Sequence, residues 1–206
     1  MARDISAIVQ RAARTTHGFG DLRRAADEIV TGHSRAESMR LAQQLYASDT
    51  YQARMIATFV FGSCASQSRE ALRFMRERVS KDADWRVQEI LAQAFDRYCA
   101  QVGYQNALAT IERWLCADQP NVRRAVSEGL RIWTSRPYFK EHPQHAIDLL
   151  SPLRDDPSEY VRRSAGNALR DISRRHRELI RAELQSWDLS DKATAQTYQL
   201  ASQFVS

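Results

Sequence analysis

Among the acids of an arginine-rich part of the sequence, three recur at equivalent regions of successive repeats: Glu89, Glu128 and Asp171. In a positive surface that binds phosphate a carboxylate is costly, because it repels the phosphate charge. It becomes useful where a positive charge develops, since it can stabilise that cation and orient an attacking water molecule. Hydrolysis of an N-glycosidic bond is such a reaction, because the sugar carbon C1′ becomes oxocarbenium-like. We therefore take these three acids as candidate catalytic residues.

The charge distribution suggests what the arginines are for. The chain of 206 residues has a net charge of +5 and a pI of about 9.4. Residues 123–181 alone hold thirteen cations and eight acids, a surplus equal to that of the whole chain. A localised positive surplus is typical of a protein that binds a phosphate backbone, so double-stranded DNA is the expected partner. A general preference for arginine over lysine explains the type of cation but not its clustering.

Two pairs of adjacent arginines are the first candidates for phosphate contacts. Arg123 and Arg124 lie in NVRRAVSEGLRIW, and Arg162 and Arg163 lie in YVRRSAGNALRDI. In repeat proteins one such arginine often pairs with an aspartate of the neighbouring repeat, and this leaves a purely structural role open for one member of each pair. The candidate DNA-binding residues are Trp85, Arg123, Arg124, Arg131, Arg162, Arg163 and Asn167.

Aromatic side chains could complete such a site. Trp85 lies four residues before Glu89, so one face of one helix would present an aromatic ring and an acid together. Such a ring can contact a deoxyribose or a cationic base. For Trp133 both a core position and a groove position stay open.

The elements that must position these residues repeat along the chain. Four segments each combine an amphipathic helix, a turn that contains aspartate, and a second helix. The second helices are anchored on Ala53, Val87, Val122 and Val161, at steps of about 34 to 39 residues, which is typical of HEAT or armadillo helix pairs. With few glycines and prolines, the sequence predicts an all-α solenoid whose second helices line a concave basic groove.

This pattern predicts a single domain, 1–206, with an N-terminal helical cap (1–36), repeats (37–175) and C-terminal helices (176–206). The cysteines are three, widely spaced and without a CxxC pair, which indicates a reduced, cytoplasmic protein. The longest apolar run is too short for a membrane span. We expect a monomer that uses no metal and no cofactor.

Two motifs carry a family resemblance. DQPNVRRAVSEGLR and SEYVRRSAGNALRDIS resemble the repeats of the bacterial DNA alkylation repair glycosylases built from HEAT-like repeats, the AlkC/AlkD type, and look most like the AlkC branch. The resemblance covers roughly residues 37–185. It implies hydrolytic excision of N3- or N7-alkylated purines from duplex DNA, which leaves an abasic site.

The resemblance also implies roles for individual residues. Glu89, Glu128 and Asp171 would be the catalytic acids, and Trp85 would be an aromatic neighbour of the site. Arg124 and Arg163 would clamp the DNA backbone, whereas Arg123 and Arg162 would be the structural members of their pairs. Two alternatives stay open: a DNA-binding relative without catalysis, and a HEAT scaffold that binds proteins.

Overall fold

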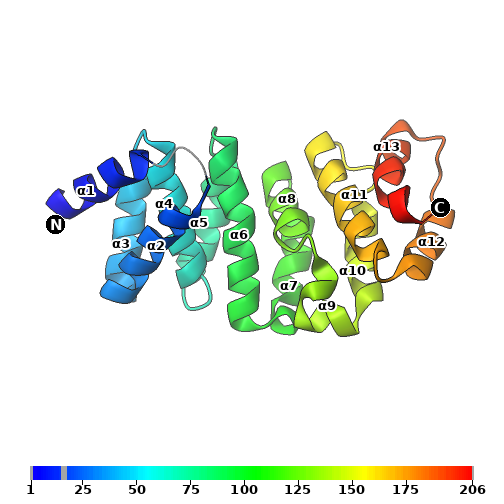
Figure 1. Ribbon diagram of the computed structural model, residues 1–206, viewed down its shortest axis with the longest axis horizontal. Coiled ribbons are helices and arrows are strands. Elements are labelled where there is room, and N and C mark those ends of the chain that lie inside the picture. The colour runs from blue at the N-terminus through cyan, green and yellow to red at the C-terminus, as the bar shows by residue number, and fades with distance from the viewer. Residues whose placement is uncertain (1, 15–17, 206) are drawn as a thin grey trace. The chain divides into compact units, whose positions relative to one another are not determined.

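The regular structure is entirely helical in the part of the chain that the computed structural model describes, residues 2–14 and 18–205. Met1, residues 15–17 and Ser206, which fall in the expected N-terminal cap and C-terminal helices, lie outside the described residues. Figure 1 shows the helices in chain order. The all-α prediction is confirmed.

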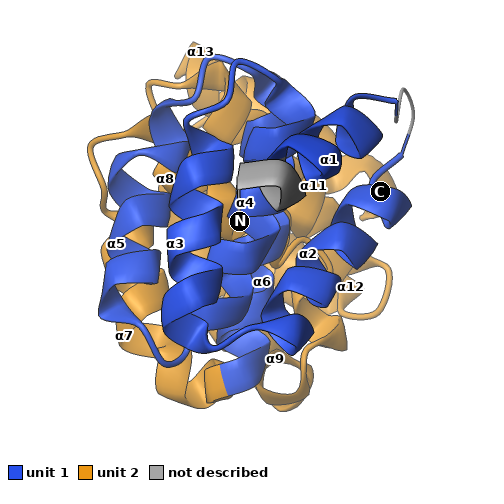
Figure 2. Ribbon diagram, turned by 90° about the vertical axis from the view of Figure 1, so that its left-hand side faces the viewer, with its two compact units in different colours: residues 1–101 blue, residues 102–206 orange. Residues whose placement is uncertain are grey.

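The chain divides into two compact units, residues 1–101 and 102–206, which Figure 2 colours separately. The helices of unit 1 are α1 (Ala2–Ala13), α2 (Gly20–Gly32), α3 (Arg35–Tyr46), α4 (Tyr51–Cys64), α5 (Arg69–Glu77), the 3₁₀ turn η1 (Val79–Lys81) and α6 (Trp85–Val102).

Unit 2 continues with shorter helices and more 3₁₀ turns. Its elements are α7 (Tyr104–Leu115), α8 (Pro120–Gly129), η2 (Trp133–Ser135), α9 (Pro137–Glu141), α10 (Pro143–Leu150), η3 (Ser151–Leu153), α11 (Glu159–Ser173), α12 (Arg177–Gln185), α13 (Lys192–Ala201) and η4 (Ser202–Phe204).

The four predicted repeats correspond to the helix pairs α3/α4, α5/α6, α7/α8 and α10/α11. The anchor residue of each second helix is fully or almost fully buried: Ala53, Val87, Val122 and Val161. Apolar residues three and four positions apart therefore fall on the core side, as the sequence periodicity indicates. The prediction of consecutive HEAT-like helix pairs is confirmed.

Local signals start these helices. Ser34 and Glu37 form a capping box at α3, and Ser68 accepts the backbone N–H of Ala71 at the start of α5. Pro120 occupies the first turn of α8, where its missing N–H costs nothing. These termini are fixed by residues within a few positions of the boundary, so the sequence alone predicts them.

Within each unit, an aspartate of a turn ties one helix pair to the next. In unit 1, Arg54 Nε donates to Asp82 Oδ2 at 2.8 Å, and Arg54 Nη1 donates to the carbonyl of Asp49. In unit 2, Arg123 Nε donates to Asp156 Oδ2 at 2.6 Å. In both units, therefore, the arginine directly after the anchor holds the aspartate of the next turn.

The interior of each unit is dominated by a few large side chains. In unit 1, α4 packs against α1, α2, α3 and α5 and buries Phe59 and Phe61. In unit 2, Trp114, Trp133 and Phe139 are among the largest fully buried side chains. No described helix combines the length and the apolar character needed to cross a membrane.

Candidate functional site

Two of the three predicted acids meet in unit 2. Arg131 Nη1 donates to Glu128 Oε1 at 3.2 Å, and Arg131 Nε donates to Asp171 Oδ2 at 3.1 Å. Ser164 Oγ donates to Glu128 Oε2 at 2.8 Å. We call these four residues, Glu128, Arg131, Ser164 and Asp171, the acid cluster. Residues 43 positions apart in the sequence thus share one arginine.

Partial burial strengthens this cluster. The side chains of Glu128 and Asp171 are 20% and 15% exposed, so their ion pairs are less screened than surface pairs. Burial by itself would lower the pKa of Arg131, but the charge of Glu128 and the hydrogen bond to Asp171 outweigh it and hold this pKa above its usual value. Arg131 is therefore a fixed cation between two acids.

Both acids lie at the C-terminal ends of their helices, where a negative charge is unfavourable. Glu128 lies in the last turn of α8, and Asp171 lies in the last turn of α11, where the helix dipole is negative. Arg170 and Arg174 compensate at Asp171, at 3.4 and 3.9 Å from Oδ1. A carboxylate at a negative helix end destabilises the isolated helix, and the neighbouring arginines offset that cost.

Two arginines, one exposed and one half-buried, lie nearer the opposite ends of the same helices. Arg163 in α11 is 69% exposed, and its Nη1 lies 3.9 Å from Glu159 Oε1. Arg124 in α8 lies over the ring of Tyr160, 5.8 Å from the ring centre, and Tyr160 is 72% exposed. An arginine and an aromatic ring that both reach solvent form a surface suited to phosphate and to a base or sugar face.

Unit 1 carries a second exposed combination of aromatic rings and arginine. Trp85, the first residue of α6, is 63% exposed. Arg86 lies 3.8 Å from the centre of the Tyr51 ring and 5.6 Å from that of Trp85. Glu89 follows Trp85 by four residues in the same helix and is half-buried, so the two share one helix face as the spacing predicts.

The first arginine of each pair is engaged inside the protein. Arg123 is buried, and its three guanidinium nitrogens donate to Asp156 and to the carbonyls of Ala117 and Asp118. Arg162 donates to the carbonyl of Asp156 and to Gln196. The expectation that Arg123 contacts DNA does not fit this burial, so the structure gives Arg123 an architectural role.

Burial decides whether Trp133 is a core or a groove residue. Trp133 is fully buried and packs edge-on against Phe139, with ring centres 4.8 Å apart, so it is a core residue. Asn167 is half-buried in α11, one turn before Asp171.

Sequence reasoning missed some members of the site. Tyr160 and Ser164 were not selected, although an aromatic residue recurs at or near the start of α4, α6 and α11 as Tyr51, Trp85 and Tyr160. This recurrence of aromatic residues at helix starts is the sequence signal that could have identified Tyr160. For Ser164 the sequence held no such signal, because only the packing of α8 on α11 brings it to Glu128.

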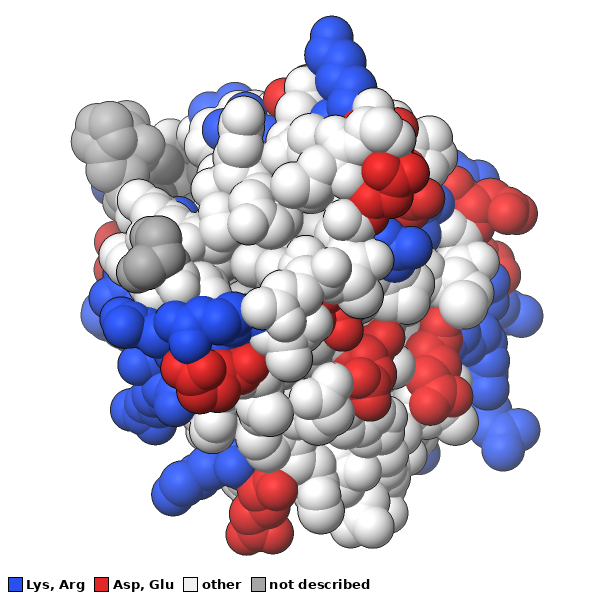
Figure 3. Space-filling model, turned by 90° about the vertical axis from the view of Figure 1, so that its right-hand side faces the viewer, with Lys and Arg blue, Asp and Glu red and all other residues white. Residues whose placement is uncertain are grey.

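Charge is mixed on the face drawn in Figure 3. Arginine and lysine side chains lie among acidic and uncharged ones there, so that face is not uniformly basic. Within residues 2–14 and 18–205, no group of three or more His, Cys, Asp or Glu residues is arranged to hold a metal ion.

Comparison with known proteins places this arrangement in a family. Residues 18–200 match the family model described as DNA alkylation repair enzyme. The chain belongs to this family. The match covers most of both units and all the candidate site residues.

Solved structures agree with this assignment. AlkD2 from Streptococcus mutans is 45% identical, with a TM-score of 0.97 over 99% of this chain and 98% of that one. The Pseudomonas fluorescens alkylpurine DNA glycosylase AlkC, solved with DNA that contains an abasic site analogue, is 23% identical, with a TM-score of 0.51 over 97% of this chain and 60% of AlkC. At that identity AlkC supports the fold alone. The AlkC-like motifs therefore occur in a chain whose structure is much more similar to AlkD2.

A curated relative covers less of the chain. Bacillus subtilis YhaZ is 36% identical over 87 residues, which are 40% of this chain and 24% of YhaZ. The chain therefore spans about a quarter of that relative.

Proposed function

We propose that this member of the family hydrolyses the N-glycosidic bond of bases that carry a positive charge through alkylation, in double-stranded DNA. The observation that carries the proposal is the acid cluster, in which two partly buried carboxylates at negative helix ends share one arginine. The two carboxylates and the negative helix ends offset the charge of the neighbouring arginines, and they supply acceptor oxygens for a cation that develops beside them.

The reaction needs little from the protein. As the C1′–N bond breaks, the cationic base takes both electrons and leaves as a neutral molecule. C1′ becomes cationic and is attacked by water, whose proton passes to a carboxylate and then to solvent. Glu128 and Asp171 supply negative charge and acceptor oxygens, and Arg131 holds both in place. Glu89, beside the exposed Trp85, is the third proposed acid.

Most of the remaining proposed residues bind the duplex. Arg163 and Arg124 are the proposed contacts to phosphate, with Asn167 on the same helix as Arg163. Trp85 and Tyr160 offer ring faces to sugar or base. Arg131 and Arg162 act mainly by positioning their neighbours.

Release of free base from methylated genomic DNA, identified by mass spectrometry, tests the proposal. Glu128→Gln and Asp171→Asn should lower the rate by about 100-fold or more, because each removes a charge that stabilises the transition state. Glu112→Gln, on an exposed position of α7, is the matched control and should keep the wild-type rate. No released base at stoichiometric protein would contradict the proposal.

One observation favours a second function, DNA binding without excision. Both oxygens of Glu128 already accept hydrogen bonds, from Arg131 and Ser164, and both oxygens of Asp171 face arginines. Acids engaged in this way also suit a purely structural cluster. Salt-dependent binding to duplex DNA, with no base release and no change in affinity in Glu128→Gln, would support this second function.

A further inference from the structure

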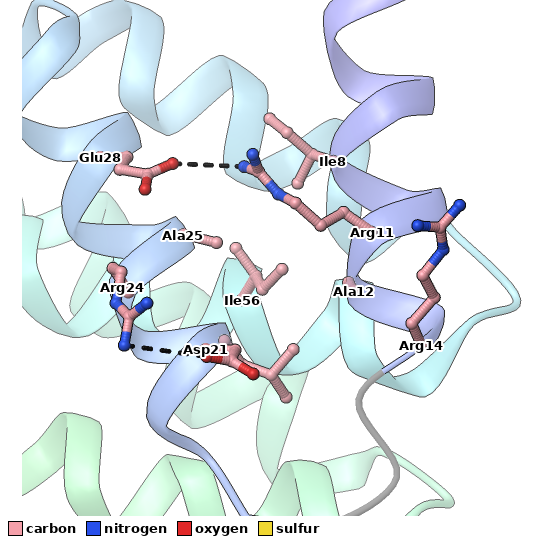
Figure 4. Close-up of a pocket in the computed structure, with 10 residues that line it drawn as sticks. Ile8, Arg11, Ala12, Arg14, Asp21, Arg24, Ala25, Glu28 and Ile56 are labelled. Carbon is pink, nitrogen blue, oxygen red and sulfur yellow. Dashed lines mark hydrogen bonds and ion pairs between the residues drawn. The ribbon is translucent and has the colours of Figure 1, made fainter.

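A pocket of about 420 Å³ opens in unit 1, on helices that carry none of the candidate site residues. It lies between α1 and α2, and Ile56 of α4 forms part of its floor (Figure 4). Ala12 and Ala25 also line it and are almost fully buried, so small side chains create the hollow where larger ones would fill it. A volume of this size is typical of small-molecule sites.

Charged side chains surround this apolar floor. Arg11 pairs with Glu28 at 3.2 Å, and Arg24 contacts Asp21 at 3.8 Å, as the dashed lines in Figure 4 show. All four side chains are more than half exposed. Exposed ion pairs contribute little to stability, so a ligand can replace them at small cost.

The combination sets requirements on a ligand. A flat body without charge fits the apolar floor, and an anionic group that accepts bidentate hydrogen bonds fits an arginine of the rim, where Arg14 adds a third. The two carboxylates, Asp21 and Glu28, require N–H donors on the edge of the flat body. A purely apolar ligand would meet only the first of these requirements.

We propose that this pocket binds a nucleotide with an exocyclic amino group, its base over Ala12 and Ala25 and its phosphate at the arginines. The base supplies the flat face and the N–H donors, and the phosphate supplies the anion. A free nucleotide and the phosphorylated end of a single strand offer this chemistry equally. The proposal is independent of base excision.

Calorimetric titration of the full chain with dAMP tests the site, beside deoxyadenosine, inorganic phosphate and a 5′-phosphorylated single-stranded oligonucleotide. dAMP should bind at least about tenfold more tightly than deoxyadenosine or phosphate, since each of these lacks one half of the recognised group. Binding of the oligonucleotide as well would identify a strand end as a source, and binding of dAMP alone would identify the free nucleotide.

Matched variants locate the binding. Ala12→Leu fills the pocket and should weaken dAMP binding about tenfold or more, whereas Ala13→Leu, on the neighbouring exposed position of α1, should not. Arg24→Ala should weaken binding about tenfold, and the exposed Arg73→Ala on α5 should not. Arg24 is exposed, so this variant stays informative if Ala12→Leu unfolds.

Several outcomes would overturn the proposal: no binding of dAMP or of the oligonucleotide at millimolar concentration, equal affinity for deoxyadenosine, or unchanged affinity in Arg24→Ala. Glu128→Gln should bind dAMP like the wild type. A failure of the nucleotide site is therefore distinguishable from a failure of the excision proposal.

Discussion

Helix α4 of unit 1 and helix α8 of unit 2 share an arginine–aspartate pair next to the buried anchor, but their surroundings differ. In each, the residue after the buried anchor is an arginine that reaches the aspartate of the next turn, Arg54 to Asp82 and Arg123 to Asp156. The second and sixth residues after the anchor differ between the two helices. Met55 and Phe59 are buried in α4, whereas α8 has Arg124 and Glu128 there.

The difference shows which positions build the fold and which are available for function. Because α4 is covered by four other helices, its second and sixth residues after the anchor serve the core. In α8 the same positions reach the surface or the acid cluster. The first arginine is therefore common architecture, and the second arginine with its acid is specific to unit 2.

The largest expected effect is on stability, at the shared arginine. Arg123→Ala should lower the free energy of unfolding by about 3 to 5 kcal/mol, because it leaves Asp156 buried without its cation. Arg54→Ala should cost less, since Arg54 is more exposed than Arg123. Urea unfolding measures both. If both variants lost the same small amount of unfolding free energy, the arginine–aspartate pairs would not be structural.

Close helix packing gives the next effect. A Cβ added at Gly62 would lie 2.6 and 2.7 Å from Ala94 Cβ and Cα, so Gly62→Ala should cost about 2 kcal/mol or more in unit 1. At Gly166 in unit 2 the nearest atom, Leu200 Cβ, would be 2.9 Å away, and the cost should be smaller. Gly32→Ala meets no atom within 4 Å and is the control. Thermal unfolding should rank the three in this order.

A smaller effect concerns DNA affinity. Arg163→Ala should weaken duplex binding about fivefold and reduce the salt dependence by about one counterion, with stability unchanged, because Arg163 is exposed. Arg113→Ala, on an exposed position of α7, is the control. Fluorescence anisotropy over a range of salt concentrations measures both. An unchanged salt slope in Arg163→Ala would remove Arg163 from the proposed interface.

The smallest effect is a pH dependence at the start of α6. Burial alone would raise the pKa of Asp84, but hydrogen bonds from the side chain and backbone of Arg86 outweigh it and lower this pKa below its ordinary value of 3.8. The stabilisation is thus present above pH 3.8 and lost as the pH falls through the folded-state pKa.

Asp84→Asn should therefore cost about 1 kcal/mol at pH 7, because it weakens the charge-assisted hydrogen bonds from Arg86, and the difference from wild type should vanish in strong acid. Unfolding curves at several pH values measure it. A difference that persists undiminished at low pH would show that the carboxylate charge is not its origin.

Much of the fold could be predicted from local patterns. Apolar spacing placed Val122 and Val161 in the core, and the helix starts carry local signals in the sequence, such as Ser34 at α3 and Pro120 at α8. Of the candidate site, the sequence selected Glu128 and Asp171 but not Ser164 or Tyr160. Their roles depend on contacts between helices, which no local pattern encodes.

The sequence by itself determined the all-helical class, the helix pairs and the buried anchors, because helix periodicity and capping involve residues only a few positions apart. Only the tertiary structure decided which partner each charge takes. Arg123 and Arg124 are neighbours in sequence, yet one is buried against Asp156 and the other lies over Tyr160. Arg131 joins Glu128, three residues away, to Asp171, forty residues away. Such pairings depend on how α8 packs against α11, since side chains forty residues apart meet only when helices dock.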